Sequence, residues 1–358
     1  MFYIETGSLD PCYNLAFEEY ILTRKTAGDW LMLWQNANTV VVGLYQNTLE
    51  EIDPDFVKTH GVTVVRRATG GGAVYHDLGN LNYSFITDAK DQETVTPERF
   101  LEPVCAALRA MGADAAVTGR NDITIRGKKV SGAAQRLHGG RILHHGTLLF
   151  ASDPAMIAGA LRARPDKFQS KSVKSVRARV GNIRDFLPGS AAEDAPGSTP
   201  GDASDAFSIE DFKSRLLAIL AGDGAARPRL DEGELSEIRI LADQKYRTWE
   251  WNFGHSPPFS LQNSRRFPGG ALDTRMDLRN GRIAAIEFFG DFLGRLPLDG
   301  IKQALTGCRY ERGAVSSVLD AFPLADLFGG VTRSDLLQTM FDSPAMFDSP
   351  KPPAAKLP

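Results

Sequence analysis

Three consecutive glycines, Gly70, Gly71 and Gly72, stand between two β-branched segments in the stretch VVRRATGGGAVYHD, residues 64–77. Glycine inside a strand loses much conformational entropy on folding and gives the core no side chain to pack against. We therefore expect a strand on each side and a glycine loop between them, which a ligand or another piece of backbone approaches closely. Arg66 and Arg67 directly precede this loop.

Two interpretations of the glycine loop stay open on these residues alone. Successive glycines can turn backbone N–H groups to one side as an anion-binding nest, and a neighbouring guanidinium offers forked donors to phosphate oxygens. Alternatively, the loop is a β-bulge or tight corner beside two solvated arginines. A dinucleotide fingerprint is excluded because Tyr75 stands where its third glycine is needed, and no Gly-Lys-Ser/Thr follows as in a Walker A loop.

The bulk composition favours an ordinary cytoplasmic enzyme or binding protein. The 358 residues are enough for two domains, and a chain with 42% hydrophobic and 24% charged residues and a net charge of −3 has no global attraction for nucleic acid or membranes. No stretch approaches the ~18 apolar residues of a membrane span, and the first residues do not resemble a targeting signal. The three distant cysteines favour a reducing compartment over a disulfide framework.

The hydrophobic pattern predicts strands in short succession with few helices between them, which is typical of an α+β fold. Residues 272–286 indicate a hairpin, because apolar and charged residues alternate and Asn280-Gly281 supplies a type I′ turn. The other predicted elements are helices at 14–25, 97–111 and 208–221, strands at 30–34, 39–44, 81–86 and 140–150, and a hairpin at 123–136 that turns near Gly127.

Charge and composition change sharply in the middle of the chain. Residues 162–184 carry eight Lys/Arg against one acid, whereas 185–210 carry six Asp/Glu and many Pro, Gly, Ser and Ala, which is typical of a flexible linker. We expect a second domain to begin near residue 231. The expected division is a catalytic domain at 1–187, a linker at 188–206, a small domain at 207–322 whose first helix is free to pack on the catalytic domain, and a partly disordered tail at 323–358 that repeats FDSP.

A second motif, GRNDITIRGKKVSGAAQR at 119–136, carries an acidic and a doubly basic pair. Asn121-Asp122 is either a turn cap or a source of one carboxylate for Mg²⁺, which prefers one or two carboxylates with phosphate oxygens. Side chains alternate along a strand, so Lys128 and Lys129 face opposite sides, and the inward one needs an anion. The inward lysine then binds a phosphate or a carbonyl group, or else it is part of a surface salt bridge.

A third motif, HHGTLLF at 144–150, brings two histidines into a strand. No further ligand stands at zinc spacing, so we do not predict a metal site there. No G-x-S-x-G elbow supports a serine triad.

The stretches RRATGGGAVYHDLGNLNYSF, GRNDITIRGKKVSGAAQR and HHGTLL, in this order and spacing, closely resemble the lipoate–protein ligases of the biotin/lipoate ligase superfamily. DPCYNLAFEE, NANTVVVGLYQN, KSVKSVRARVGNIRDFLPG and WEWNFGHSPPF extend the resemblance to about residue 310. The resemblance implies a large α+β catalytic domain with mixed sheets and flanking helices, followed by a small α+β accessory domain.

The resemblance also implies a reaction in two steps. Lipoate would be activated by ATP and Mg²⁺ to lipoyl-AMP, and the lipoyl group would then pass to a lysine ε-amine on a carrier domain. The implied carriers are the E2 subunits of 2-oxoacid dehydrogenases and the glycine cleavage H protein. From the composition and the absence of a stacking platform we expect a cytoplasmic protein that binds no nucleic acid or membrane, and a monomer is the default expectation.

The family's functional residues fall on matching positions of this sequence. The resemblance assigns catalysis to Lys129, proposes Asp122 as a magnesium ligand, and leaves His76 and His145 as candidates for lining the pocket. The implied contacts to ATP or lipoyl-adenylate are Arg67, Gly70, Gly71, Gly72, Ala73, Val74, Tyr75, Asn121, Asp122 and Lys129.

Other classes remain to be separated from this one. An octanoyl- or lipoyltransferase without ATP activation would need an exposed, activated cysteine, and of Cys12, Cys105 and Cys308 only Cys12 lies in a stretch that could approach the site. A transferase of preformed lipoyl-AMP would share the same motifs.

A biotin ligase is disfavoured, because the glycine–arginine loop of biotin ligases is patterned differently from RRATGGG. A nucleic-acid-binding protein would depend on 162–184, which has one aromatic residue for base stacking.

Overall fold

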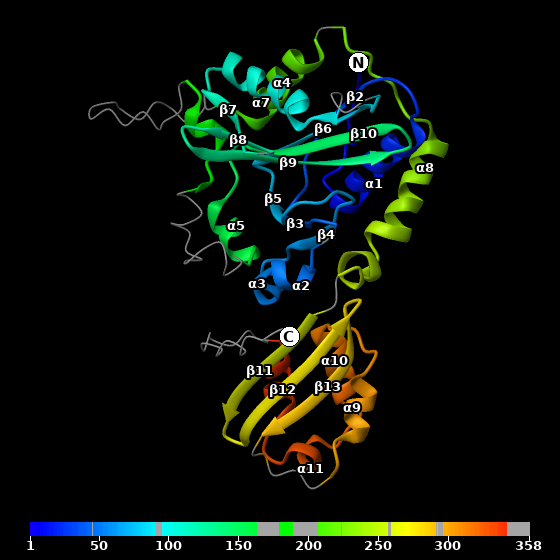
Figure 1. Ribbon diagram of the computed structural model, residues 1–358, viewed down its shortest axis with the longest axis vertical. Coiled ribbons are helices and arrows are strands. Elements are labelled where there is room, and N and C mark those ends of the chain that lie inside the picture. The colour runs from blue at the N-terminus through cyan, green and yellow to red at the C-terminus, as the bar shows by residue number, and fades with distance from the viewer. Residues whose placement is uncertain are drawn as a thin grey trace, which may run out of the picture. The chain divides into compact units, whose positions relative to one another are not determined.

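The computed structural model describes residues 1–44, 46–90, 95–119, 121–162, 179–188, 207–222, 224–256, 259–290, 292 and 296–341. The chain divides into two compact units, Met1–Asn252 and Phe253–Pro358 (Figure 1).

The first unit is built on two β-sheets. In the larger sheet the first pair of strands is parallel and the others are antiparallel, whereas in the smaller sheet one outer strand is parallel and the other antiparallel to the central strand. The larger sheet has the order β1 (Phe2–Ile4), β2 (Trp30–Trp34), β6 (Asn80–Asp88), β10 (Arg141–Leu149), β9 (Lys128–His138), β8 (Asp122–Ile125) and β7 (Ala115–Thr118), and the smaller has the order β4 (Thr63–Arg66), β3 (Thr39–Val42) and β5 (Val74–His76).

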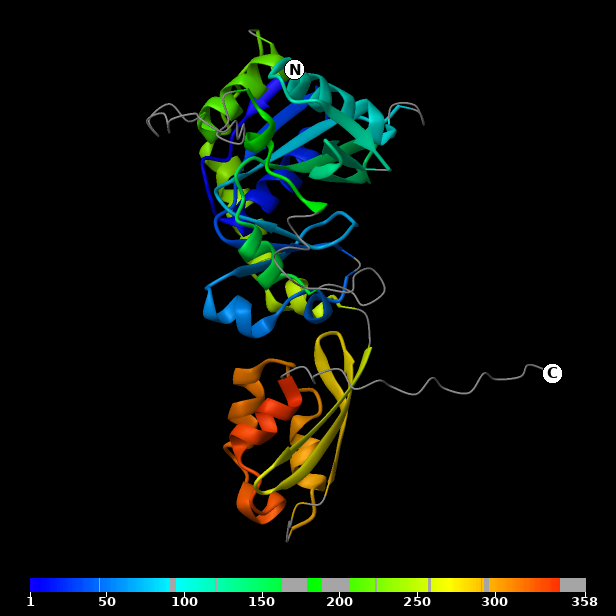
Figure 2. The same cartoon turned by 90° about the vertical axis from the view of Figure 1, so that its left-hand side faces the viewer.

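Each face of the larger sheet buries its own hydrophobic core, because successive side chains of a strand point to opposite faces. Leu31 and Leu33 of β2 join the core beneath α4 (Pro97–Ala110) and α7 (Ile209–Ala221). Trp30, Met32 and Trp34 join the core that contains α1 (Pro11–Arg24), part of α8 (Glu232–Leu241) and side chains of the smaller sheet. The smaller sheet and the larger sheet therefore face each other (Figures 1 and 2).

Local capping chemistry explains where the helices begin. The Asp10 carboxylate accepts a hydrogen bond from the backbone N–H of Cys12, and Pro11 occupies the first turn, so α1 begins three residues before the predicted position. Ser208 and Asp211 form a capping box at α7. Shorter helices described in this unit are α2 (Thr48–Glu51), α3 (Pro54–Thr59), α5 (Pro154–Ala160), a 3₁₀ helix at Ile183–Phe186 and a π-helical turn at Ala242–Tyr246, and a further π-helical turn, Glu250–Gly254, begins in it.

The second unit is an antiparallel sheet with helices on one side (Figure 2). Asn280 and Gly281 have φ angles of 49° and 67°, so the predicted type I′ hairpin turn is confirmed. Leu272, Met276 and Leu278 are buried as the alternation predicts. The elements are β11 (Phe259–Phe267), β12 (Gly270–Arg279), β13 (Arg282–Gly290), α9 (Asp299–Leu305), α10 (Arg312–Leu319), α11 (Leu324–Phe328) and α12 (Arg333–Phe341).

Two of the predicted boundaries differ from the structure. The helix predicted at 208–221 belongs to the first unit, because Phe212 and Leu216 are fully buried in the core shared with α4. The second unit begins at Phe253 rather than at 207 or 231. The expected tail from 323 is folded as far as Phe341, since the apolar side of α12 is buried. Most of the expected linker (189–206), most of the basic segment (163–178) and both FDSP repeats beyond Phe341 lie outside the described residues.

The α+β prediction is confirmed by this arrangement. Among the described residues, no helix is both long and apolar enough to cross a membrane.

Candidate active site

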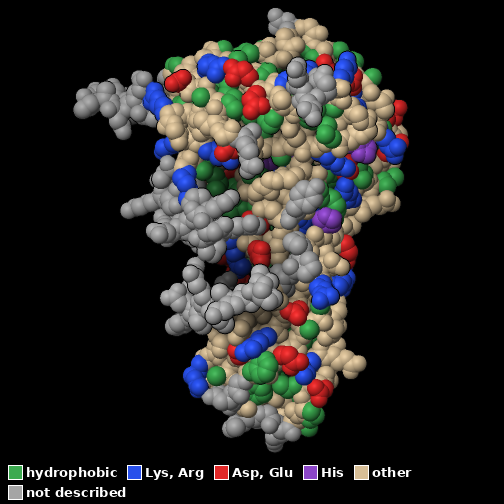
Figure 3. Space-filling view, viewed as in Figure 1, with side chains coloured by type: hydrophobic (Ala, Val, Ile, Leu, Met, Phe, Trp, Pro, Cys, Tyr) green, Lys and Arg blue, Asp and Glu red, His purple; other side chains and the backbone are tan. Residues whose placement is uncertain are grey.

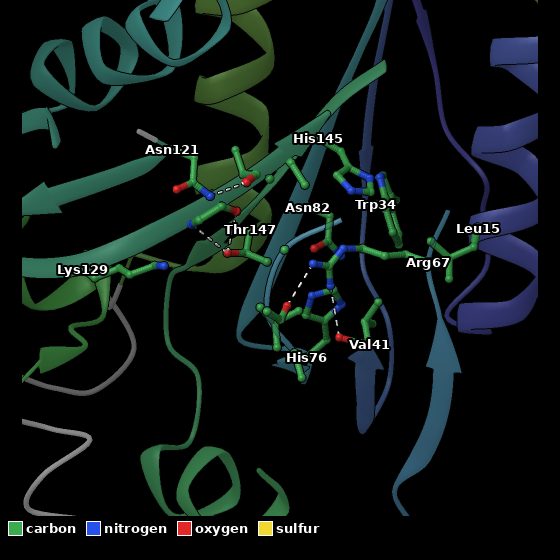
Figure 4. Close-up of a pocket in the computed structure, with 18 residues that line it drawn as sticks. Leu15, Trp34, Val41, Arg67, His76, Asn82, Asn121, Lys129, His145 and Thr147 are labelled. Atoms are coloured by element: carbon green, nitrogen blue, oxygen red, sulfur yellow. Dashed lines mark hydrogen bonds between the residues drawn. The ribbon is translucent and has the colours of Figure 1, made fainter. Parts of the chain in front are cut away.

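A pocket of about 140 Å³ opens where the smaller sheet faces the larger one (Figure 4). Its walls come from the glycine loop, from β3 and β5 of the smaller sheet, and from β2, β6, β9 and β10 of the larger sheet. Lys129 and Asn121 lie at one end in Figure 4, which we call the outer end. Trp34, His76 and Asn82 lie away from Lys129, with Leu15 and Val41, at what we call the inner end.

Arg67 holds the glycine loop from inside. Its guanidinium donates through Nη2 to the carbonyl oxygens of Gly70 and Gly72, at 2.7 and 2.9 Å, and through Nη1 to Val41 O at 3.2 Å. Burial lowers the pKa of Arg67 to about 10, which still leaves it charged at neutral pH. The solvated arginine of the alternative interpretation is therefore wrong for Arg67, which is buried and also lines the pocket.

A hydrogen-bonded chain connects Arg67 to a buried carboxylate. Arg67 Nε donates to Thr69 Oγ1 at 2.9 Å, and Thr69 Oγ1 lies 2.8 Å from His145 Nε2. His145 Nδ1 lies 2.9 Å from Glu18 Oε1, which also accepts from Ser84 Oγ at 2.5 Å. The links agree with one another when Nδ1 donates to the Glu18 carboxylate and Nε2 accepts from the Thr69 hydroxyl. The chain fixes the position of the arginine that holds the loop.

Arg66 is also buried, but it serves a different segment. Its Nη1 donates to the backbone oxygens of Gly43, Leu44 and Gln46, and its Nε donates to Trp251 O at 3.0 Å. Burial lowers the pKa of Arg66 to about 10. This arginine ties β4 to the loop after β3 and to the end of the first unit, and it does not line the pocket.

Gly71 shows why the loop needs glycine. Its φ of +94° is rarely adopted by residues with a side chain, and an added Cβ would lie 2.9 Å from Arg67 Nη2. An added Cβ on Gly43 would lie 2.0 Å from the carbonyl oxygen of Gly71, so the two backbones are in direct contact. At Gly72 a Cβ would meet open space.

Lys129 stands at the outer end of the pocket. Its Nζ makes an ion pair with Asp122 Oδ1 at 2.7 Å, and the two side chains are 44% and 33% exposed, so both keep contact with solvent. The side chain passes over Gly132, where an added Cβ would lie 3.0 Å from Nζ. The lysine and the carboxylate are neighbours because β8 and β9 pair across the hairpin that the sequence predicts.

A second cavity of about 560 Å³ adjoins the first. Lys129, Gly132, Thr147, Ala73 and Val74 line both cavities, so Lys129 stands at their junction. The larger cavity adds Asp122, Tyr75, Ser131 and Arg162.

The structure brings most of the predicted site residues together. Asn121 donates through Nδ2 to Ala133 O at 2.6 Å, which joins its turn to β9 while it lines the pocket. Gly70 lines neither cavity and contributes its carbonyl oxygen to Arg67. The predicted residues that line one or both cavities are Arg67, Gly71, Gly72, Ala73, Val74, Tyr75, His76, Asn121, Asp122, Lys129 and His145.

Of the inner end of the pocket, sequence reasoning named only His76. Trp34 and Asn82 come from strands β2 and β6, and the alternation shows only which residues share a face, not which face meets the smaller sheet. Leu15 belongs to a helix that was predicted without any role in a site. The lining residues that were not predicted are Leu15, Trp34, Val41, Asn82, Gly132, Ala133, Ala134, Gly146 and Thr147.

The cysteines are not placed for covalent catalysis. Cys12 is buried and its thiol donates to Tyr246 O at 3.3 Å, while burial raises its pKa to about 11. Burial also raises the pKa of Cys105 to about 11 and that of Cys308 above its usual value. None of these thiols lines either cavity, and a thiol with a raised pKa is a poor nucleophile.

A narrow pocket with an apolar inner end, a larger cavity beside it and a lysine at their junction are suited to an enzyme that activates a carboxylic acid with a nucleotide. This is the class of protein that the fold and the site define, and comparisons with known proteins identify the family within it.

A family model described as Lipoyl protein ligase A/B catalytic domain matches residues 10–221, and one described as Bacterial lipoate protein ligase C-terminus matches residues 256–340. The chain is 38% identical to Lipoate-protein ligase LplJ of Bacillus subtilis over 95% of this chain and all of that protein.

Two solved structures are similar to most of this chain. A bi-partite lipoate protein ligase of Thermoplasma acidophilum, described together with its E2 lipoyl domain, has a TM-score of 0.59 and 32% identity over 71% of this chain and 96% of its own. Lipoate-protein ligase A bound with ATP has a TM-score of 0.57 and 30% identity over 71% of this chain and 98% of its own. The chain belongs to the lipoate–protein ligase family and is an enzyme of the ligase class.

Proposed function

We propose that this enzyme activates lipoate with ATP and then lipoylates a carrier protein. In the first step the lipoate carboxylate attacks the α-phosphorus of ATP, which forms lipoyl-AMP and releases pyrophosphate. In the second step the ε-amine of a lysine on a lipoyl domain attacks the acyl carbon of this mixed anhydride. The amide bond forms, AMP leaves with the electron pair of the broken acyl–oxygen bond, and the amine loses a proton.

The observation that carries the proposal is the position of Lys129 at the junction of the two cavities. A carboxylate from the narrow pocket and an α-phosphate from the larger cavity would meet at its ammonium group. Negative charge on these oxygens changes in both transition states, and a preorganised cation there lowers the barrier. Holding the two reactants in contact supplies much of the remaining acceleration.

The glycine loop would form the wall along which the acyl-adenylate lies. Gly72 has open space where a Cβ would stand, so a ligand can approach the main chain closely. Arg67 would act by holding this wall, because its guanidinium is bonded to the loop carbonyls of Gly70 and Gly72. Its direct contact with phosphate, which the resemblance implies, stays a prediction.

Asp122 is the candidate ligand for Mg²⁺. The described residues contain no group of three or more His, Cys, Asp or Glu that could hold a metal ion. One carboxylate fits a magnesium ion whose other ligands are phosphate oxygens and water. Magnesium would neutralise phosphate charge, and Lys129 would be released from Asp122 to meet the reacting oxygens.

The carrier would be a lipoyl domain, as the related Thermoplasma protein is described with its E2 lipoyl domain. The glycine cleavage H protein as a further carrier, a monomeric state and a cytoplasmic location stay predictions.

Figure 3 shows Lys/Arg and Asp/Glu side chains interspersed on one face, so the described side chains there do not form a patch of a single charge sign.

The experiment is pyrophosphate release from ATP and lipoate, with and without apo lipoyl domain. Release with lipoate alone is expected, because the first step needs no acceptor. If pyrophosphate is absent while transfer from synthetic lipoyl-AMP proceeds, the enzyme is a transferase of preformed adenylate and the proposed first step is wrong.

A further inference from the structure

Two N–H groups at the inner end of the pocket have no hydrogen-bond partner among the described residues. They are His76 Nε2 and Asn82 Nδ2, on side chains whose residues are 3% and 2% exposed. Both residues line the pocket, and Figure 4 places them away from Lys129. A buried polar group without a partner is destabilising, so these two indicate that something in the pocket supplies an acceptor.

The tautomer of His76 is fixed by a chain of asparagines. Asn14 Nδ2 donates to Asn36 Oδ1 at 2.9 Å, so the amide nitrogen of Asn36 is the atom that faces His76 Nδ1, at 3.1 Å. An amide nitrogen can only donate, and the ring Nδ1 must therefore accept. The proton of the neutral ring is then on Nε2. Burial, with the positive charge of Arg67 as a further cause, lowers the pKa of His76 to about 3, which keeps the ring neutral at physiological pH.

The amide of Asn82 is placed by one hydrogen bond. Its Oδ1 accepts from Asn80 Nδ2 at 3.0 Å, and its Nδ2 has no partner among the described residues. Trp34 neighbours both groups. It is paired with Asn82 on neighbouring strands, and its ring meets the His76 ring edge-on at 6.5 Å.

The surroundings define the kind of acceptor that fits. Leu15, Trp34 and Val41 make the inner end mainly apolar, so an ionised group would be poorly solvated there. The carboxylate of the substrate is expected at Lys129, and the far end of the acyl chain therefore reaches the two donors. A ring that is largely apolar but carries weak acceptors matches both features.

We propose that His76 and Asn82 recognise the dithiolane sulfurs of lipoate and thereby select a lipoyl over a saturated acyl chain of the same length. This inference rests on the proposed function. Divalent sulfur is a weak acceptor, whereas an octanoyl chain offers none and leaves both N–H groups unpaired. A site built to donate hydrogen bonds discriminates against analogues that cannot accept them.

The test compares lipoate with octanoate in His76→Phe and Asn82→Leu. Phe keeps a ring against Trp34 without the N–H, and Leu keeps the size of Asn without the amide. The readouts are kcat/KM for pyrophosphate release and, without ATP, the calorimetric Kd of each acid. We expect each variant to lower the lipoate-over-octanoate ratio about tenfold, the factor of one modest buried hydrogen bond, mainly through lipoate. His76→Gln, which keeps an N–H donor, should recover part of the ratio.

His144→Phe is the matched control. His144 is also buried and both ring nitrogens lack a described partner, but it stacks on Phe100 with ring centroids 4.8 Å apart and does not line the pocket. The lipoate-over-octanoate ratio of His144→Phe should equal that of the wild type. If wild type activates lipoate and both pocket variants keep the wild-type ratio, the two donors serve only an ordered water and the inference is wrong. If wild type activates neither acid, the proposed function fails instead.

Discussion

At the outer end of the pocket, Lys129 and Asp122 form an ion pair whose side chains remain partly in solvent, whereas at the inner end His76 and Asn82 are neutral and almost completely buried. Lys129 and Asp122 lie on a hairpin. Lys129 can exchange Asp122 for a ligand at small energetic cost, because exposed ion pairs contribute little to stability. At the inner end, His76 is held by a hydrogen bond from Asn36, and Asn82 accepts one from Asn80.

The difference indicates a division of labour between the two ends. The positive charge that stabilises the reacting oxygens is carried by Lys129, a flexible side chain near solvent. Recognition of an unreacting part of the substrate is assigned to fixed, uncharged groups, which avoid the desolvation penalty of buried ions. The glycine loop lies between the two ends and is held by a buried arginine with all its described bonds inside the protein.

The largest effect is expected from Gly71→Val, which disturbs the wall that joins the two ends. The φ of +94° strains any side chain, and the new atoms would push against Arg67 Nη2. We expect kcat/KM to fall about 100-fold or more, since a displacement of about 1 Å in a positioned site has effects of that size. Steady-state pyrophosphate release measures it.

Gly61→Val is the control for backbone strain alone. Gly61 also has a positive φ, of +59°, but an added Cβ there meets open space, and the residue does not line the pocket. It should lose stability in urea denaturation and keep kcat/KM near wild type. An active Gly71→Val enzyme would show that the loop does not contact the ligand closely.

The dependence of stability on pH tests the neutral state of the buried histidines. Burial lowers the pKa of His76 and of His144 to about 3, against about 6.5 in an unfolded chain. The unfolded chain therefore binds more protons between these values, and the free energy of unfolding should fall as pH drops from about 6.5 toward 3. Each histidine contributes up to about 1.4 kcal/mol per pH unit in that window.

Urea unfolding at pH 7.5, 6.0 and 5.0 measures this slope. His144→Phe should flatten it by the share of one histidine, while His138→Asn, at an exposed position, should not change it. An unchanged slope in His144→Phe would mean that the ring is protonated in the folded protein.

The smallest effect is expected from Cys12→Ser, which lies outside both ends of the pocket. The serine hydroxyl can still donate to Tyr246 O, so we expect both steps to keep their rates within about twofold and stability to fall by about 1 kcal/mol. Rapid-quench assays with mass spectrometry of the intact enzyme check this. A thioester on Cys12, or loss of transfer in the variant, would move the enzyme into the thiol-dependent transferase class.

The outer end could be predicted from the sequence because its residues lie in contiguous motifs. The hairpin at 123–136 and the two strands around the glycines were located, and they bring Lys129 to the loop that contains Gly71 and Gly72. Apart from His76, the inner end could not be predicted, since it depends on which face of β2 and β6 meets the smaller sheet. That choice is made by tertiary packing, as Trp34 and Asn82 show.

The roles of Arg66 and Arg67 could not be predicted from the sequence either. A buried guanidinium that bonds backbone carbonyls looks the same in the sequence as a solvated one, and only the fold shows Arg66 against Trp251 and Arg67 against the glycine loop. The domain boundary was misplaced because the amphipathic helix at 209–221 gives no indication of which core receives Phe212.

The central claim is that Lys129, at the junction of the two cavities, serves both chemical steps. The most direct measurement is a single-turnover comparison of Lys129→Ala with Lys128→Ala, the adjacent lysine that lines neither cavity. Adenylate formation from ATP and lipoate and transfer from synthetic lipoyl-AMP to apo lipoyl domain are timed separately. The account predicts that Lys129→Ala slows both steps about 100- to 1,000-fold while Lys128→Ala stays within about threefold of wild type. A Lys129→Ala enzyme that performs either step at close to the wild-type rate would contradict it.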